Sequence, residues 1–306
     1  MSELVKNRSE ILFLYDVKDA NPNGDPLDEN KPRIDEETGV NIVTDVRLKR
    51  TIRDYLHEYK GQDVFIREIR DEKGNLKTKE DRLNDFKNNP SEIIEKCIDI
   101  RLFGATTAVE NQTMALTGPV QFKYGRSLHK VDLTYIKGTT VMPSAAEKRQ
   151  GTFTERYILP YSLIAFYGIV NENAAANQRL RLREEDIFLM LEGIWNGTKN
   201  LISGSKFGQM PRFLMQVIYK EGAGFYIGEL DRRISLYSTK NTDEEIRTIT
   251  DVKVDITNLI KALSDHKDKI EKIRLKADER VTFMMDGKDI NIENALSGFK
   301  VEPLNF

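Results

Sequence analysis

Three segments of the chain carry the apolar patterns of strands. Residues 11–17 (ILFLYDV) form a short run of β-compatible side chains, and the turn residues NPNGDP follow at once. This order predicts a strand that ends in a tight loop. Residues 117–127 alternate apolar and polar side chains, as a half-buried strand does, and residues 156–170 form a longer β-rich stretch.

Other segments carry apolar residues at helical spacing. From Thr44, a good N-cap residue, apolar positions recur every three or four residues, which predicts a helix over residues 45–59. Asn89-Pro90 supplies a cap and a first-turn proline, so a second helix is expected from there to about residue 102. An acidic first turn precedes a third apolar stripe, which predicts a helix over residues 184–196.

Turn residues between apolar runs predict two hairpins in the last third of the chain. One spans residues 213–230 around EGAG, and the other is a strand pair around Asp286-Gly287, with a helix over residues 257–269 between them. The order strand, helix, strand, strand, helix, strand fits a split βαβ sheet of ferredoxin-like type. The predicted fold class is therefore α+β, with insertions making up the excess length.

Two long polar segments are expected at the surface. Residues 70–91 are rich in Lys, Asp and Asn and show no apolar period. Residues 128–155 are too long for a tight turn and too polar for a core, so they should project as an arm. Val141 and Met142 lie near the middle of this arm, where a hairpin tip would carry them furthest from the core.

Composition excludes several classes of protein. The 306 residues are 39% hydrophobic, which is enough to bury a core, so disorder of the whole chain is excluded. One cysteine and three histidines cannot form an internal disulfide or a Cys-based zinc site. No uncharged apolar run approaches the roughly 18 residues that a membrane span needs, and we expect a soluble, cytoplasmic protein without a membrane partner.

Charge is nearly balanced in total but segregated along the chain. The 47 basic and 49 acidic residues give a net charge of −2, yet residues 101–160 contain eight basic and four acidic side chains. Residues 1–40 have the reverse bias, with five basic and ten acidic side chains. Because phosphate is bound by a local patch and not by the total, this balance leaves nucleic-acid binding open.

The loop GSKFGQMPR (204–212) is the strongest candidate for a phosphate contact. Its glycines allow close approach of a backbone, and its cations supply counter-charge. Alone, it could equally be an ordinary solvated connection. The basic flank of the predicted helix over 45–59 and the basic arm also favour a polyanion. The candidate contacts are Arg47, Lys49, Arg50, Arg53, Ser205, Lys206, Gln209 and Arg212.

The segment DANPNGDPLDEN partly matches a calcium loop. Residues 19–24 agree with its first half, but position twelve is Asn30 where a bidentate Glu is needed, and two prolines interrupt the loop. A turn whose side chains bind its own backbone is the preferred interpretation. The structural residues of this turn are Asn21, Asn23, Gly24 and Asp25. No catalytic centre, metal site or cofactor is predicted, since GxxxxGK[ST] and HExxH are absent from the sequence.

Five motifs of the chain together resemble the backbone subunit family of type I CRISPR Cascade effectors, RAMP-superfamily proteins of the I-B and I-C subtypes. They are DxNPNGDP, TDVRLKRTIRDYL, RLFGA, ALTGPVQF and GSKFGQMPR. The likeness runs through most of residues 10–230. It implies a modified RNA-recognition-motif palm with a helical insertion and a long β-hairpin thumb. On this basis residues 1–306 form a single elaborated domain, with the insertion at about 61–116 and the thumb at about 128–155.

The resemblance also implies a function. Such subunits oligomerise along CRISPR RNA (crRNA) through sugar-phosphate contacts and present the guide for pairing with target DNA in antiviral defence. The implied partners are crRNA, target DNA through the guide, copies of the chain in a helical filament, and other Cascade subunits. The guide must be held by its backbone, because its base edges have to stay free for pairing. Val141 and Met142 would then be a thumb wedge against a base.

Two alternatives remain open from the sequence. Related backbone subunits of type III effectors cut RNA with a loop aspartate. The first alternative is therefore a metal-dependent RNA-cleaving RAMP nuclease that uses Asp19 or Asp25. A generic single-stranded RNA-binding protein is the other, and it would bind without regular spacing of subunits. The I-B and I-C relatives are taken as non-catalytic, so we expect no enzyme.

Overall fold

The computed structural model describes residues 3–109, 112–139 and 153–306, and it is a mixed α+β fold built on one large sheet. In these residues, nine strands form the sheet, in the order β17-β14-β11-β1-β10-β8-β4, with β7 and β9 also paired to β10. The central strand β1 is antiparallel to both β10 and β11. The strands are β1 (Ser9–Ala20), β4 (Val40–Val43), β7 (Val120–Phe122), β8 (Gly125–Lys130), β9 (Thr134–Thr139), β10 (Phe153–Val170), β11 (Gln209–Tyr219), β14 (Ile270–Ala277) and β17 (Val301–Pro303).

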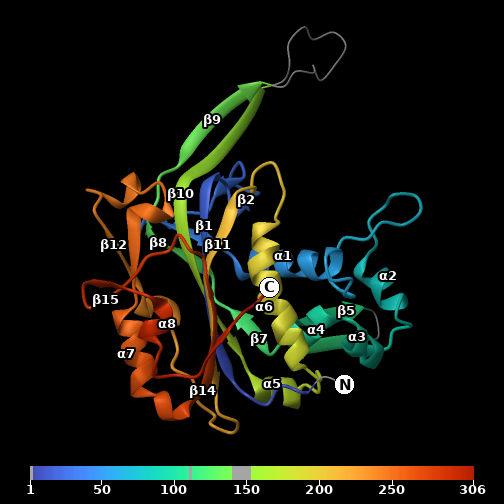
Figure 1. Ribbon diagram of the computed structural model, residues 1–306. Helices are drawn as coiled ribbons and strands as arrows, with labels where there is room; N and C mark the ends of the chain where they lie inside the picture. The colour runs from blue at the N-terminus through green and yellow to red at the C-terminus, as the bar shows by residue number, and fades with distance from the viewer. Residues whose placement is uncertain (1–2, 110–111, 140–152) are drawn as a thin grey trace.

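Both faces of the sheet are covered, and β1 therefore contributes to two cores. Ile11 and Phe13 face the core that contains residues of α1 (Asp45–Glu58) and α6 (Glu184–Lys199). Leu12, the residue between them, faces the opposite core under the C-terminal part of the chain. Figure 1 shows α1 and α6 on one side of these strands and α7 on the other. The helices predicted over 45–59 and 184–196 are confirmed.

The C-terminal part adds a second, four-stranded sheet in the order β12-β13-β15-β16. Its strand pair around Asp286-Gly287 is confirmed as β15 and β16. The helix predicted over 257–269 is α7, which ends at Asp265 and is followed by a 3-10 turn. The elements are β12 (Ser235–Ser238), β13 (Val252–Asp255), α7 (Thr257–Asp265), β15 (Phe283–Met285), β16 (Lys288–Ile290) and α8 (Ile292–Ala295).

The hairpin predicted over residues 213–230 is wrong, because a buried carboxylate takes the backbone groups of its second strand. Glu10 on β1 is fully buried and accepts hydrogen bonds from two tyrosine hydroxyls. It also accepts from the backbone N–H groups of Ile227 and Gly228, at 2.8 and 2.7 Å. A buried charge needs such donors, so the segment after Tyr219 turns back over β1 and forms no strand.

Residues 61–116 form a side unit next to the sheet, shown in Figure 1, with a small core of its own. The helix predicted from residue 89 to 102 is broken in two at Cys97, whose backbone is extended and forms a bridge to Asp63. Burial raises the pKa of the Cys97 thiol to about 12, so it is a neutral, small core residue. The elements are α2 (Lys79–Asn84), α3 (Pro90–Lys96), α4 (Ile98–Phe103), β5 (Gly104–Val109) and β6 (Gln112–Thr117).

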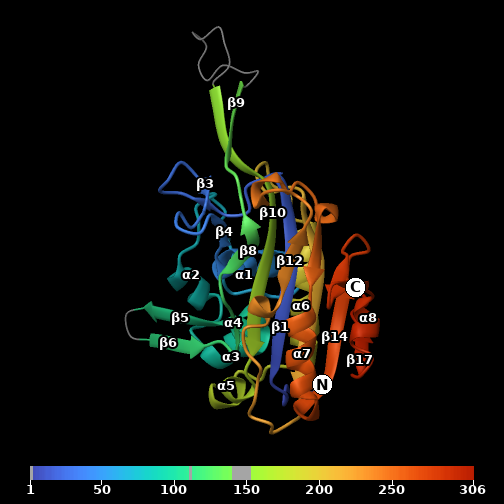
Figure 2. The ribbon, with the colours of Figure 1, turned by 90° about the vertical axis from the view of Figure 1, so that its left-hand side faces the viewer.

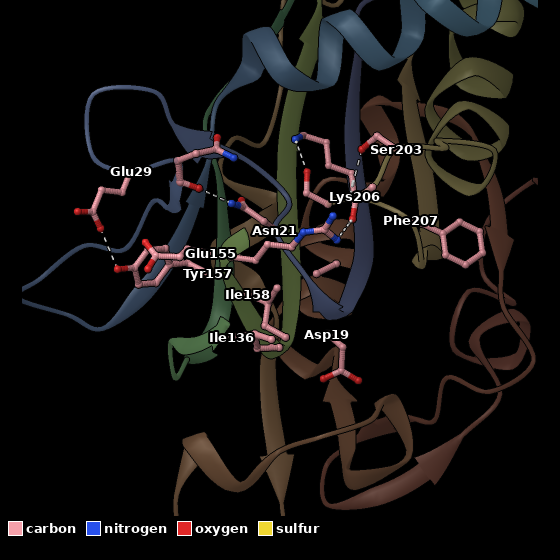
Figure 3. A pocket seen from close by; sticks show the side chains of 15 residues that line it. Asp19, Asn21, Glu29, Ile136, Glu155, Tyr157, Ile158, Ser203, Lys206 and Phe207 are labelled. Atoms are coloured by element: carbon pink, nitrogen blue, oxygen red, sulfur yellow. Dashed lines mark hydrogen bonds between the residues drawn. The ribbon is translucent and has the colours of Figure 1, made fainter. Parts of the chain in front are cut away.

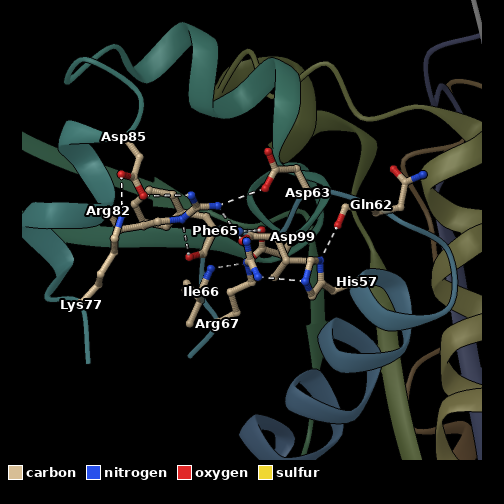
Figure 4. Close-up of polar contacts among 11 residues, drawn as sticks. His57, Gln62, Asp63, Phe65, Ile66, Arg67, Lys77, Arg82, Asp85 and Asp99 are labelled. Carbon is tan, nitrogen blue, oxygen red and sulfur yellow. Dashed lines mark hydrogen bonds and ion pairs between the residues drawn. The ribbon is translucent and has the colours of Figure 1, made fainter. Parts of the chain in front are cut away.

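A polar network joins this side unit to α1. Asp99 is fully buried and accepts hydrogen bonds from the N–H groups of Phe65 and Ile66, at 2.7 and 3.1 Å. Arg53 on α1 completes the site with its Nε 2.9 Å from Asp99. Figure 4 shows Arg82 nearby, paired with an aspartate and lying over aromatic rings. The Asp99 carboxylate therefore holds α1, the 63–67 segment and α4 together.

The β9–β10 pair extends beyond the sheet as a two-stranded arm, seen in Figure 2. Strand β10 is 18 residues long; its residues 153–158 pair with β9, and the following residues pair with β1. Of the arm predicted over 128–155, residues 128–130 belong to β8. Val141 and Met142 lie outside the described residues. No helix in the described part of the chain is long and apolar enough to span a membrane.

A bidentate ion pair anchors α6 to the side unit. The Nε and Nη2 atoms of Arg101 lie 2.9 and 2.8 Å from the Asp186 carboxylate, and both side chains are only 4% exposed. Arg101 also donates to the carbonyl of Glu95 at 2.7 Å. Breaking such a pair leaves an uncompensated buried charge, which costs far more than an exposed pair contributes.

We predict that Arg101→Met lowers the free energy of unfolding by about 3–5 kcal/mol, because the buried Asp186 carboxylate loses the guanidinium that pairs with it. Urea denaturation followed by circular dichroism measures this. The matched control is Lys96→Ala, which breaks an exposed pair with Glu92 on neighbouring α3 and should leave stability nearly unchanged. Equal effects of the two substitutions would contradict the assignment.

Candidate nucleic-acid interface

A cavity of about 900 Å³ lies where β10 leaves the sheet for the arm. Three segments line it: the loop that follows β1, the base of the β9–β10 arm, and the 203–207 loop between α6 and β11 (Figure 3). The 203–207 loop is the first part of the GSKFGQMPR segment. The strongest sequence candidate for a phosphate contact therefore opens onto a cavity.

The loop after β1 is closed by its own side chains. Asn21 is buried, and its Nδ2 donates to the carbonyl of Asn30 at 2.6 Å. A Cβ atom at Gly24 would lie 2.6 Å from the backbone oxygen of the same Asn30, so only glycine fits there. Residues 21–30 form a tight loop with a short strand pair, β2 (Gly24–Asp25) and β3 (Lys31–Pro32).

The same loop also fixes the start of α1. The Oδ1 atom of Asn23 accepts hydrogen bonds from the N–H and the hydroxyl of Thr44, both at 2.9 Å. Thr44 is the N-cap of α1. The Asp25 carboxylate lies 2.6 Å from Nη1 of Arg33, which holds the far side of the loop. Asn21 and Asp25 thus hold the loop itself, and Asn23, through Thr44, orients the helix that carries Arg47.

Among the candidate cations, Arg47 and Lys206 form no ion pair within the described residues; Lys206 lines the cavity, and Arg47 on α1 is close enough to lower its pKa. Arg47 is half-buried; it donates to the Thr51 hydroxyl at 3.0 Å, and its Nε has no hydrogen-bond partner. The Lys206 ammonium lies 3.3 Å from the Ser205 hydroxyl. Burial, and secondarily the positive charge of Arg47, lower the pKa of Lys206. The pair is a site of unbalanced positive charge, which an anion would stabilise.

Lys49 and Arg50, on the same helix, are paired within it. Lys49 Nζ is 3.0 Å from Asp45, and Arg50 Nε is 2.7 Å from Asp54, both with helical i,i+4 spacing. The Arg50 pair is exposed on the surface, where water screens it. Arg50 can therefore exchange its carboxylate for a phosphate at small cost, whereas the Lys49 pair is largely withdrawn from water.

The remaining candidates lie in the interior. Arg53 forms the pair with Asp99 described above, and Arg212 lies 2.9 Å from Asp16 and 2.7 Å from Asp278. Gln209 is buried at the start of β11. In the GSKFGQMPR segment, therefore, the first cation faces the cavity region and the second is neutralised inside the protein.

Sequence reasoning missed Arg156, which also lines the cavity. Its Nη1 donates to the Gly204 carbonyl at 3.0 Å, and no ion pair involves it among the described residues. The available signal was a cation at the first position of the long apolar stretch 156–170, where a strand leaves the core.

Carboxylates are present at the cavity but are dispersed. Asp19, Glu29 and Glu155 line it, whereas Asp25 is engaged with Arg33. Within the residues that the structure describes, no group of three or more His, Cys, Asp or Glu side chains could hold a metal ion.

Comparisons with known proteins agree with one another. The sequence profile of a family described as "CRISPR-associated protein Cas7" matches residues 7–257. A protein of Haloferax volcanii with the same description is 32% identical over 90% of this chain and 88% of its own length.

Solved structures with the same fold extend this result. A chain described as "CRISPR RNA-guided surveillance complex" matches with a TM-score of 0.55 and 14% identity, over 96% of this chain and 94% of its own. A second, described as "CRISPR RNA-guided surveillance complex, pre-nicking", matches with a TM-score of 0.57 and 11% identity, over 97% and 96%. The profile and the relative decide the family: the chain belongs to the Cas7 family of CRISPR-associated proteins.

Proposed function

We propose that the chain is a backbone subunit of a Cascade effector complex. It binds crRNA along the sugar-phosphate backbone, stacks with copies of itself into a helical filament beside other Cascade subunits, and leaves the guide free to pair with target DNA. Membership of the Cas7 family supports this role. The cytoplasm is the compartment that fits it.

The pair of Arg47 and Lys206 is the observation that carries the proposal. Burial lowers the pKa of both cations, and for Lys206 the positive charge of Arg47 adds to the effect. A phosphate group would offset this cost through its opposite charge. Ser205 and the glycines around it allow a sugar-phosphate chain to come close, and no base-specific side chain is needed for such a contact.

The finer architecture is part of the proposal. The order β11-β1-β10-β8, with α1 and α6 on one face, is that of a βαββαβ unit, which supports a modified RNA-recognition-motif palm. Residues 61–116 would be its helical insertion. The β9–β10 arm would be the thumb, with Val141 and Met142 as the wedge against a base.

The candidate residues divide by their ion pairs. Arg47 and Lys206 are direct phosphate contacts, and Lys49 and Arg50 exchange their helix carboxylates for phosphates when RNA is bound. Ser205 belongs to the same surface as a hydrogen-bonding group, whereas Gln209 is buried behind it at the start of β11. Arg53 and Arg212 are paired with buried carboxylates and hold in place the elements that carry the site.

We propose no catalytic activity for this subunit. A nuclease of the alternative kind needs a loop aspartate that is free to recruit a metal ion. Asp25 is held by Arg33 and by the N–H of Leu27, at 2.6 and 3.0 Å, which supports a structural use. Asp19 is exposed at the cavity, but no group of three metal-ligating side chains includes it among the described residues.

We predict that Lys206→Gln and Arg47→Gln each weaken binding to unrelated single-stranded RNA sequences by similar factors. Each should also reduce the slope of log K against log salt by about 0.7, the value for one lost phosphate contact on a single strand. Filter binding or fluorescence anisotropy at several salt concentrations measures both quantities. Lys253→Gln, which removes a paired lysine from the C-terminal sheet, is the control and should change neither. A loss confined to one RNA sequence would mean base readout.

Replacing residues 138–146 with a short Gly-Ser turn is expected to leave thermal unfolding of the isolated subunit nearly unchanged, because the arm extends away from both cores. Assembly at regular intervals on guide RNA should be impaired, as electron microscopy and analytical ultracentrifugation would detect. Unfolding of the subunit would show that the arm belongs to the core. If the intact chain binds guide RNA without regular spacing, and the replacement does not change this binding, the generic RNA-binding alternative is favoured.

Incubation with single-stranded RNA and Mg²⁺ or Mn²⁺ should leave the RNA intact on a denaturing gel. The control is Asp25→Ala in the same preparation, which separates activity of this chain from contaminating nuclease. Cleavage by the unaltered protein that Asp25→Ala abolishes would overturn the non-catalytic assignment.

A further inference from the structure

The 203–207 loop has few hydrogen bonds of its own. The N–H groups of Lys206 and Phe207 both donate to the Ser203 carbonyl at 3.2 Å, which forms one local turn. Phe207 and Gly208 are exposed and do not pack the loop against the core. Local structure alone therefore does not fix the direction in which Lys206 points.

Two contacts from distant parts of the chain hold this loop. The N–H of Asn21 donates to the Ser205 carbonyl at 2.7 Å, and Arg156 Nη1 donates to the Gly204 carbonyl at 3.0 Å. The first contact joins two backbones. Among the described residues, Arg156 supplies the one side-chain tether between the loop and another element.

Such a tether is needed because the position of Lys206 is electrostatically unfavourable. Burial and the nearby Arg47 both oppose its charge in the absence of an anion. An untethered loop would relax by moving the ammonium group into water. A fixed loop keeps the two cations close together before the anion arrives, which lowers the ordering cost of binding.

Arg156 lies on the arm, and its neighbour Tyr157 makes a separate contact on the other side of the strand. The Tyr157 hydroxyl donates to Glu29 at 2.8 Å, within the loop after β1, whereas Arg156 reaches the 203–207 loop. Successive residues of a strand point to opposite faces, so the base of the arm lies between two loops. Figure 3 shows Tyr157 with Glu29 at one end of the cavity and Lys206 at the other.

We propose that Arg156 is a positioning residue of the phosphate site: through the Gly204 carbonyl it sets the 203–207 loop so that Lys206 lies beside Arg47. This inference rests on the proposed RNA-binding function. It also ties the base of the arm to the loop, so that the arm and the phosphate site share one conformation. Direct contact of Arg156 with a phosphate is the competing explanation, since the side chain is exposed and has no ion pair among the described residues.

A double-mutant cycle with Lys206→Gln separates the two explanations. Arg156→Ala alone should weaken binding of a single-stranded guide RNA by about three- to tenfold, the effect of one lost hydrogen bond of ordinary strength. In the Lys206→Gln background, Arg156→Ala should change neither the affinity nor the salt slope, because the residue that it positions is already gone. Additive losses, with a further slope decrease of about 0.7, would make Arg156 a direct contact and overturn the proposal.

Hydrogen exchange of the RNA-free protein gives a second readout. Arg156→Ala should accelerate amide exchange at Lys206 and Phe207, whose N–H groups close the local turn. The matched control is Tyr157→Phe, which removes the contact on the other side of the same strand and should leave this exchange unchanged. Unaltered exchange in Arg156→Ala, or equal acceleration in both variants, would refute the positioning role.

The outcome also distinguishes this inference from the proposed function. If Lys206→Gln leaves RNA affinity unchanged, the phosphate site itself is wrong, and the positioning role falls with it. If Lys206→Gln weakens binding and Arg156→Ala does not, the phosphate site stands and only the role of Arg156 is wrong.

Discussion

Burial of β1 on both faces is the constraint on which the rest of the structure depends. The strand lies at the centre of the sheet with a core on each side, so every polar group along its buried part, residues 9–17, must find its partner inside the protein. Glu10 and Asp16 are two buried carboxylates on it. Glu10 takes backbone N–H groups from residues 227–228 and so directs the chain after β11. Asp16 takes the guanidinium of Arg212 and so fixes the segment that enters β11.

These pairings sort the cations of the candidate interface. A buried carboxylate neutralises Arg53 and another neutralises Arg212, so both act in folding, whereas Arg47 and Lys206 keep an unbalanced charge. The sequence does not reveal this division, because the partners are remote: Asp99 is 46 residues from Arg53, and Asp278 is 66 residues from Arg212. The local sequence alone gave Arg47, Arg53, Lys206 and Arg212 the same standing as candidate RNA contacts.

What the sequence could predict follows from the range of the interactions involved. Helix α1 was predictable, because Thr44 and its apolar stripe act within a few residues. The hairpin over 213–230 failed because its turn signal was local while the competing acceptor, Glu10, lies more than 200 residues away. The break at Cys97 has the same kind of cause, a bridge to Asp63 that no helical period records. Arg156 was missed because its partner is a backbone carbonyl, and such a partner cannot be identified from the residue types in the sequence.

The position of the cavity is a consequence of unequal strand lengths. β1 ends at Ala20, opposite Leu159 of β10, and β10 continues past that point to pair with β9 through residues 153–158. Because β10 extends beyond the end of β1, it leaves an open space beside it. The loop that follows β1 and the loop that precedes β11 enter this space. Lys206 and Arg156 come from separate elements and meet there because this is where the sheet divides. The strand that forms the arm is therefore also a wall of the cavity, and a movement of the arm that shifts Arg156 acts directly on the loop that carries Lys206.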